Sequence, residues 1–490
     1  MSNVVSLKAG IDQSYFGMIL AQEAGALAQT FMAKRPLVAD RIAAGKALRR
    51  TTPRSRHAAY ELRADRPDPV AILEQQNETR VQKLVPVRYA RMLASPFTFL
   101  RGSAAVMASD LSTTPVTGMT VVACGDMHVS NFGVYASAER NLIFSINDFD
   151  EVHPGPWEWD LKRLAASAAV AMRFMEGDKA EAQEAAHEVV RSYRRHMWRY
   201  AEMGYLEIWY ERIDESAVLG AISPRLRQGA KRIMDKARRQ GHVRVLGKLT
   251  VMVGGERRLI EDVPLIVREA HSDGGLPADV AIDRMLHAYI DSLGHDRKLL
   301  LSRYRIVDVV RKVVGVGSVG TSCWVILLQG IDGDDPLFLQ VKQAQQSVLA
   351  PYVDIKLPFE MHGRRVVAGQ RLTQGSPDIF LGWGDVDGRQ FYVRQLADMK
   401  GSVKFSEHGA ITREGFIEYC RLCGWALALA HAKSGDPAMI AGYCGKSAAL
   451  DEAIGRFAMV YAKQTEKDHA ALEKARRTGP IEVASLSAVK

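Results

Sequence analysis

Two short apolar runs, each ending in an acidic residue, constrain this chain more than any other feature. MTVVACGD (119–126) and NLIFSIND (141–148) are rich in β-branched or apolar residues and end in Gly or Asp, as strands do where they enter turns. Asp126 and Asp148 therefore lie at the ends of two adjacent strands, and Asn131 follows Asp126 in a short loop. The pattern predicts a small β-structure that presents two carboxylates and an amide oxygen.

Two carboxylates and an amide oxygen suit a hard divalent cation. Mg²⁺ takes few protein oxygens and leaves its other positions to water and phosphate. We expect Asn131 and Asp148 to bind the metal, and Asp126 to orient or accept the proton of an attacking hydroxyl. The structural alternative is that these residues are ordinary turn residues or helix caps. The Asp-Phe-Asp sequence and the helix start GPWEWDLKRL after it favour the functional interpretation.

Helical and strand patterns divide the chain into four segments. Residues 1–90 mix helical patches with Pro- and Arg-rich stretches, which predicts an irregular N-terminal extension. Residues 91–300 carry the acidic strand ends and long helical periodicity. Residues 301–400 predict a small sheet with one helix, and residues 401–490 are helical again. The class predicted is α+β.

A glycine loop lies in the predicted small sheet. Gly315, Gly317 and Gly320 form a G-x-G-x-x-G pattern, which includes Ser318, between two strand-like runs. Glycines there let backbone N–H groups approach phosphate oxygens without a side chain in the way. A Rossmann fold would need a helix directly after Gly320, whereas TSCWVILLQG reads as a strand. The pattern therefore indicates a phosphate-binding loop between strands.

A lysine follows the glycine loop in the next predicted strand. Lys342 lies in LFLQVKQA, where its ammonium would neutralise phosphate charge. The helix predicted at FEMHGRRVVAGQRLTQ (359–374) offers Glu360 as a partner for Lys342, and other polar residues of that helix compete for the role. RQFYVRQL (389–396) then predicts a further strand. Arg101, in FLRGS, is either a phosphate contact or half of a structural ion pair.

Composition excludes several classes of protein. No run reaches the ~18 apolar residues that a membrane-spanning helix needs, and the first thirty residues lack the pattern of a secretory signal. Five scattered cysteines argue against a disulfide framework. The net charge of +9 indicates either an anionic ligand or a basic surface, and no nucleic-acid-binding motif is present. We expect a cytoplasmic protein with neither membrane nor nucleic-acid partners.

The motifs together resemble those of kinase-like phosphotransferases. GDMHVSN resembles the catalytic loop H-G-D-x-H-x-x-N of aminoglycoside and choline kinase-type enzymes, although Cys124 replaces the first histidine. INDFDE resembles their metal-binding strand I-D-x-[DE]. The run from SPFTFLRG through CGDMHVSNFG to NDFDEVHPGPWEWDLKRLA is similar to the DUF2252 proteins, an uncharacterised bacterial family grouped with the kinase-like fold. The similarity covers most of residues 85–475.

The resemblance implies a protein-kinase-like fold of two lobes and a role for each motif residue. Asp126 would be the catalytic base, and Asn131 and Asp148 would be metal ligands. Asp160 would hold the backbone of the catalytic loop. The supporting positions are His128, Asp150, Asp160 and Glu360.

The order of the motifs implies circular permutation. In kinases the glycine loop and the lysine precede the catalytic loop, whereas here they follow it. Residues 304–396 would form a small nucleotide lobe inserted after the catalytic-loop segment. Residues 412–432 resemble the helix that in kinases runs into the catalytic loop. Chain order does not matter to a site built from groups adjacent in space.

These expectations lead to three hypotheses for function. The first is an ATP- and Mg²⁺-dependent phosphotransferase that acts on a hydroxyl group of a small molecule, with nucleotidyl transfer from the same site left open. The second is a metal-dependent phosphoesterase in which Asp126, His128, Asp148 and Asp150 hold two metals. The chain lacks the downstream Asn-His motif that such a phosphoesterase needs. The third is a catalytically silent nucleotide-binding module.

Overall fold

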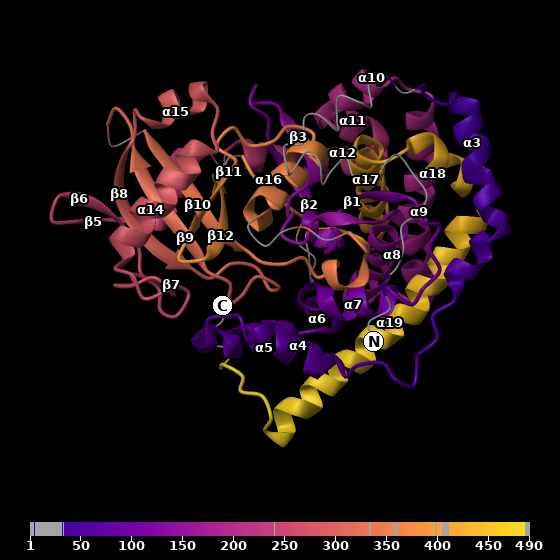
Figure 1. Cartoon of the computed structure of the whole chain (residues 1–490), viewed down its shortest axis with the longest axis horizontal. Helices are drawn as coiled ribbons and strands as arrows, with labels where there is room; N and C mark the ends of the chain where they lie inside the picture. The colour runs from indigo at the N-terminus through magenta and orange to yellow at the C-terminus, as the bar shows by residue number, and fades with distance from the viewer. Residues whose placement is uncertain are drawn as a thin grey trace.

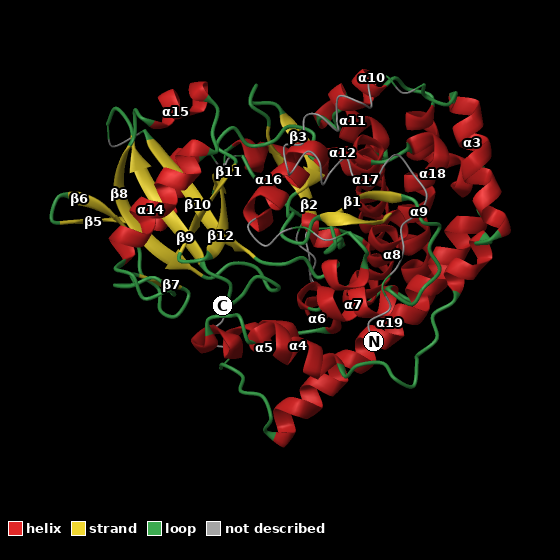
Figure 2. Ribbon diagram, viewed as in Figure 1, coloured by secondary structure: helices red, strands yellow, loops and turns green. Residues whose placement is uncertain are grey.

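The computed structural model shows a mixed α+β protein, as the sequence predicts. A larger helical part lies beside a smaller part that carries the main sheet (Figure 1, Figure 2). Glu360, predicted as a supporting residue, lies outside the described part of the chain. The structure describes Val4, Met32 and residues 34–239, 241–332, 335–355, 357, 361–396, 399–403 and 411–485.

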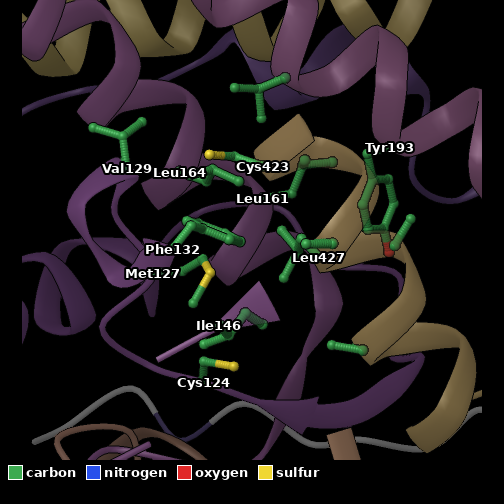
Figure 3. Packing of buried hydrophobic residues seen from close by; sticks show 14 of the residues in the cluster. Cys124, Met127, Val129, Phe132, Ile146, Leu161, Leu164, Tyr193, Cys423 and Leu427 are labelled. Atoms are coloured by element: carbon green, nitrogen blue, oxygen red, sulfur yellow. The ribbon is translucent and has the colours of Figure 1, made fainter. Parts of the chain in front are cut away.

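Four long helices form the centre of the helical part. They are α8 (Trp157–Phe174), α9 (Lys179–Ala201), α17 (Arg413–Ser434) and α19 (Ala449–Thr478). Small side chains let α9 and α17 approach closely. At Gly424, an added Cβ would lie 2.2 Å from the carbonyl oxygen of Val189. Figure 3 shows Leu161, Tyr193 and Leu427 among the buried side chains at this centre.

Shorter helices surround this centre and flank the sheet. Before α8 they are α3 (Val38–Ala47), α4 (Pro69–Asn77), α5 (Val85–Leu93), α6 (Pro96–Gly102) and α7 (Ala104–Leu111). After α9 they are α10 (Tyr205–Tyr210), α11 (Glu215–Ala221), α12 (Pro224–Arg238), α13 (His242–Leu249), α14 (Ala278–Asp291), α15 (His295–Leu301), α16 (His362–Thr373) and α18 (Pro437–Cys444). No helix in the described ranges is long and apolar enough to cross a membrane.

The main sheet has six strands, each antiparallel to its neighbours, in the order β11-β12-β10-β9-β8-β7. The strands are β7 (Ile266–Val267), β8 (Arg305–Lys312), β9 (Cys323–Gln329), β10 (Pro336–Ala344), β11 (Gly382–Val386) and β12 (Arg389–Gln395). The small sheet with one helix predicted for residues 301–400 is confirmed. The sequence did not predict β11, and β7 joins the sheet from the preceding segment. A separate hairpin is formed by β5 (Thr250–Val253) and β6 (Glu256–Leu259).

Side-chain alternation along β10 decides which way its lysine points. Leu339 and Val341 pack with Met285 and Tyr289 of α14 on one face of the sheet. Successive side chains in a strand point to opposite faces. Lys342 therefore points away from α14, toward the helical part, where its ion-pair partners lie.

Two small sheets carry the acidic strand ends. They are β1 (Thr120–Ala123) with β4 (His153–Pro156), and β2 (Phe132–Ala136) with β3 (Leu142–Ile146). The expectation that the strands ending at Asp126 and Asp148 are adjacent is wrong, because β3 pairs locally with β2 in a hairpin and β4 returns to pair with β1. A backbone hydrogen bond from Asn147 to the carbonyl of Asn131 (2.8 Å) nevertheless keeps the two acidic ends together.

The close approach of α9 and α17 generates a prediction about helix glycines. Gly424→Ala should lower the free energy of unfolding by about 1–3 kcal/mol, because overpacking outweighs the gain in helix propensity. Gly229 lies in α12 with open space around it, so Gly229→Ala should raise stability by about 0.5–1 kcal/mol. Urea denaturation followed by circular dichroism checks both changes. Equal effects of the two substitutions would contradict the helix contact.

Candidate functional site

The loop after β1 is held by the first turn of α8. The Asp160 carboxylate accepts hydrogen bonds from the backbone N–H groups of Cys124 (2.6 Å) and Gly125 (2.9 Å). Gly125 has a φ of +75°, which a glycine adopts without strain. His431 Nε2 lies 3.3 Å from Asp160 Oδ2 and fixes the carboxylate from α17. The loop backbone is therefore tied to two helices of the buried centre.

Asp126 is oriented by the next turn of the same helix. Arg163 donates from Nε to Asp126 Oδ1 (3.1 Å), and its Nη2 also bonds this oxygen. Burial raises the pKa of Asp126, and Arg163 opposes this rise. His128 Nε2 lies 3.7 Å from Asp126 Oδ2, and burial lowers the pKa of His128 well below its usual value. A neutral imidazole and an arginine thus flank a carboxylate that lines a cavity.

The residues expected to bind a metal offer unused oxygens. Asn131 lies in the short helix Val129–Asn131 and donates from Nδ2 to the carbonyl of Asp126 (2.6 Å), which leaves its amide oxygen available. Asp148 Oδ1 is buried and has no hydrogen-bond partner. Burial and the neighbouring Asp150 raise the pKa of Asp148, while Lys342 opposes the rise. A divalent cation would satisfy this oxygen, so the donor set fits Mg²⁺.

Lys342 reaches the acidic residues from the main sheet. Its Nζ lies 2.6 Å from Asp150 Oδ2 and 3.7 Å from Asp148 Oδ1. Asp150 also accepts hydrogen bonds from the Tyr392 hydroxyl and from Ser318 Oγ (3.2 Å). Burial alone raises the pKa of Asp150, but Lys342 and the hydrogen bonds lower it to about 2. The lysine and the acidic residues therefore form one polar cluster between the two parts of the molecule.

Helix α16 binds the backbone on both sides of the acidic residues and the lysine strand. Among the described residues, the carboxylates that pair with Lys342 are Asp148 and Asp150, both from the loop after β3. From α16, Arg365 donates to the backbone carbonyls of Asp150 (2.9 Å) and Gln345 (2.8 Å). Arg365 of α16 thus holds the backbone around Asp150.

The glycine loop lies over Asp126. Gly315 and Gly320 have φ values of +68° and +89°, which lie in the left-handed region. A Cβ added to Gly317 would lie 3.1 Å from the carbonyl oxygen of Arg101 and 4.0 Å from Asp126 Oδ2. The loop tip therefore approaches both the end of α6 and the acidic cluster. A larger residue at Gly317 would prevent this close approach.

Most of the predicted site residues line one cavity together with residues that the motifs did not reveal, whereas Lys342, Gly320 and Asp160 lie outside its lining. Its volume is about 90 Å³, and Asp126, Asn131, Asp148 and Asp150 line it together with Gly315, Gly317 and Ser318. Sequence reasoning missed its wall of arginines, of which only Arg101 was considered, and it missed Arg163 behind Asp126. Arg163 follows Asp160 by three residues on α8, a spacing that places both on one helix face and could have identified it. The arginines that line the cavity are Arg80, Arg88 and Arg101.

Comparison with known proteins identifies one match. A family model described as "Uncharacterized protein conserved in bacteria (DUF2252)" matches residues 80–475. This span contains every described residue of the site. No curated protein and no solved structure matches the chain.

The ion pair generates a prediction about stability. Lys342→Met should lower the free energy of unfolding by about 2–4 kcal/mol, because it leaves two neighbouring carboxylates without their cation. Adding Asp150→Asn should recover part of this loss. Lys298→Met is the control, because Lys298 pairs with Asp291 at the surface (3.7 Å) and should contribute less than about 1 kcal/mol. A double-mutant cycle in urea measures the coupling, and a zero coupling energy would contradict the pair.

Proposed function

The chain belongs to the DUF2252 family, and from the geometry of its site we propose that it is an ATP- and Mg²⁺-dependent phosphotransferase. The observation that carries the proposal is the meeting of Lys342 with Asp148 and Asp150. Lys342 and Asp150 are 192 positions apart in the chain, yet they form an ion pair. Asp150 also accepts a hydrogen bond from Ser318 of the glycine loop and lines the same cavity as Asp126. Phosphoryl transfer needs such a set of cations, metal ligands and a base around one phosphate.

We also propose that the fold is kinase-like and circularly permuted. From β8 to β12 the chain runs through strand, glycine loop, strand, lysine strand, helix and two strands, which is the order expected for a kinase small lobe. The end of α17 lies beside β1, since the N–H of Val122 donates to Ser434 Oγ (3.2 Å). In an unpermuted kinase, the helix would continue into the catalytic loop at this point.

The proposed reaction assigns one task to each residue. Asn131 and Asp148 would hold Mg²⁺, which when bound would neutralise charge on the phosphate oxygens. Lys342 and the backbone N–H groups of the glycine loop position the phosphates. Asp126, held by Arg163, aligns the acceptor hydroxyl and accepts its proton. The acceptor oxygen bonds to the terminal phosphorus, the bond from that phosphorus to the bridging oxygen breaks, and ADP leaves.

A second cavity supplies space for the rest of a nucleotide. Its volume is about 280 Å³, and it is lined by Asn147, which precedes Asp148, and by Arg394 of β12. Tyr135, Leu337 and Phe380 contribute aromatic and apolar surface to it. Such a surface suits a base, because aromatic and apolar side chains line most small-molecule sites. The phosphoesterase hypothesis has less support, since the described residues contain no group of three or more His, Cys, Asp or Glu side chains arranged to hold a metal.

Nucleotide binding tests the proposal first. ATP with Mg²⁺ should raise the melting temperature by about 2 °C or more, because a ligand that binds only the folded state stabilises it. Asp148→Ala should abolish the Mg²⁺-dependent part of this shift, whereas Asp291→Ala, at an exposed surface position, should leave it unchanged. Differential scanning fluorimetry with and without Mg²⁺ measures the shifts. If no nucleotide stabilises the wild-type protein, the proposed function is wrong.

Turnover tests the role of Asp126. Asp126→Asn should keep binding of ATP with Mg²⁺ but lower the slow hydrolysis of ATP by about 10²–10⁴-fold, because the general base is lost. Chromatography of the nucleotide products distinguishes phosphoryl transfer from nucleotidyl transfer. ADP supports phosphoryl transfer, whereas AMP with pyrophosphate or an AMP adduct indicates nucleotidyl transfer. Hydrolysis at the wild-type rate in Asp126→Asn would remove Asp126 from the mechanism.

A further inference from the structure

Arginines from the N-terminal helices line the cavity that holds the acidic residues. Arg80 follows α4, Arg88 lies in α5, and Arg101 lies in α6, and all three line the cavity with Asp126 and Asp148. The cavity therefore has carboxylates and guanidinium groups facing the same small volume. The carboxylates suit a metal ion, so the arginines need a different explanation.

Apolar contacts fix the glycine loop to these helices. Val319 is fully buried with Leu84 and Val87, and Val316 belongs to a buried cluster with Leu73 and Tyr89. These contacts explain why the loop lies against α4 and α5. A loop anchored by two buried valines keeps its position relative to the helices that carry the arginines.

Hydrogen bonds join the loop to the same segment. Arg80 Nη1 donates to the carbonyl of Val319 (2.5 Å), and Arg91 Nη1 donates to the carbonyl of Gly315 (2.6 Å). The backbone N–H of Val81 donates to the carbonyl of Gly320 (2.8 Å). The loop and the arginine-bearing segment thus form one continuous wall of the cavity.

Arg101 lacks the partners that buried arginines usually have. Its side chain makes no hydrogen bond or ion pair with the described residues, and its Nε is buried without a partner. Its guanidinium lies 6.0 Å from the centre of the Phe97 ring. Burial lowers the pKa of Arg101, and the negative charges of Asp126 and Asp148 oppose this effect. A half-buried cation whose Nε is buried without an acceptor loses hydration that no anion replaces. A ligand that carries negative charge would remove this cost.

Arg80 also lacks some of the hydrogen-bond partners that its guanidinium could bind. Its Nε is buried without a partner, and it forms no ion pair with the described carboxylates, although Nη1 bonds Val319. Burial lowers its pKa to about 10, so it stays charged at neutral pH. Arg88 differs, because its guanidinium donates to neutral acceptors that include Gln76 Oε1 (2.9 Å) and the carbonyl of Gly102 (3.1 Å). Arg88 therefore braces the helices, while Arg80 and Arg101 keep unused donors at the cavity.

We propose that Arg80 and Arg101 form a binding subsite for a phosphate group in the cavity that Asn131 and Asp148 also line. Guanidinium groups bind phosphate oxygens through charge-assisted hydrogen bonds of matching geometry. The identity of the phosphate rests on the proposed function: it is the terminal phosphate of the nucleotide or a phosphate carried by the acceptor. Both sources present the same oxygens to the two arginines.

Binding of inorganic phosphate, without nucleotide or Mg²⁺, tests the subsite directly. The dissociation constant from calorimetry should rise about tenfold or more in Arg101→Gln, since hydrogen bonds to a charged group are lost, and less in Arg101→Lys. Lys83→Gln removes one charge from the same segment at an exposed position and should bind phosphate like the wild type. No binding by the wild type, or equal binding by Arg101→Gln, would overturn the subsite.

A melting curve without ligand separates binding from folding. Arg101→Gln should melt at or above the wild-type temperature, because the Arg101 side chain makes no hydrogen bond with the described residues and its half-buried charge is costly. A large decrease in melting temperature would assign Arg101 a structural role instead. Arg80→Gln provides a second variant, and it should also weaken phosphate binding.

Repeating the phosphate titration with saturating nucleotide and Mg²⁺ identifies the source. If ATP excludes phosphate and ADP does not, the subsite holds the terminal phosphate of the nucleotide. If phosphate still binds in the presence of ATP, the subsite belongs to the acceptor, which is then a phosphorylated molecule. Arg101-dependent phosphate binding in a protein that binds no nucleotide would retain the subsite and reject the phosphotransferase. Nucleotide binding by a protein whose phosphate binding does not depend on Arg101 would retain the phosphotransferase and reject the subsite.

Discussion

The ion pair between the Lys342 ammonium and the Asp150 carboxylate is the interaction on which the site depends. Lys342 lies on the main sheet, and Asp150 follows β3 in the helical part, so the pair joins the two parts of the molecule. Because Lys342 is almost fully buried, leaving it unpaired would be costly. The pair also keeps Asp148 within 3.7 Å of the ammonium. The glycine loop leads directly into β9, the neighbour of the lysine strand, and is thereby brought over Asp126.

Helix α8 supports the other half of the site. Asp160 and Arg163 lie one turn apart on one face of this helix, where Asp160 binds the loop backbone and Arg163 binds the Asp126 side chain. Their helix is buried along most of its length. Asp126 therefore depends on a rigid element for its orientation, although it lies in a loop. Such support is what a catalytic carboxylate needs to hold one geometry.

Local patterns predicted β1, β3, β8, β9, β10 and β12, the glycine loop and the helix at 359–374, because side-chain periodicity and turn residues act over a few positions. Pairing between strands depends on the whole fold, so the partner of β1 was predicted wrongly. Lys342 was predicted on a strand, but its pairing with Asp150 depends on how the sheet meets the helical part. Arg80 belongs to no local motif, because its role follows from the cavity it faces after folding. The catalytic and metal-binding roles of the site residues stay predictions.

The two valines that anchor the glycine loop have a consequence for ligand exchange. In a loop that opens as a free flap, a ligand enters and leaves by lifting a few residues. Here the loop cannot lift without exposing Val316 and Val319, which lie among buried residues of α4 and α5. Entry and release of a ligand at this cavity would therefore require the N-terminal helices to move with the loop, or the sheet to part from the helical part. Release would then be slower than loop motion alone allows.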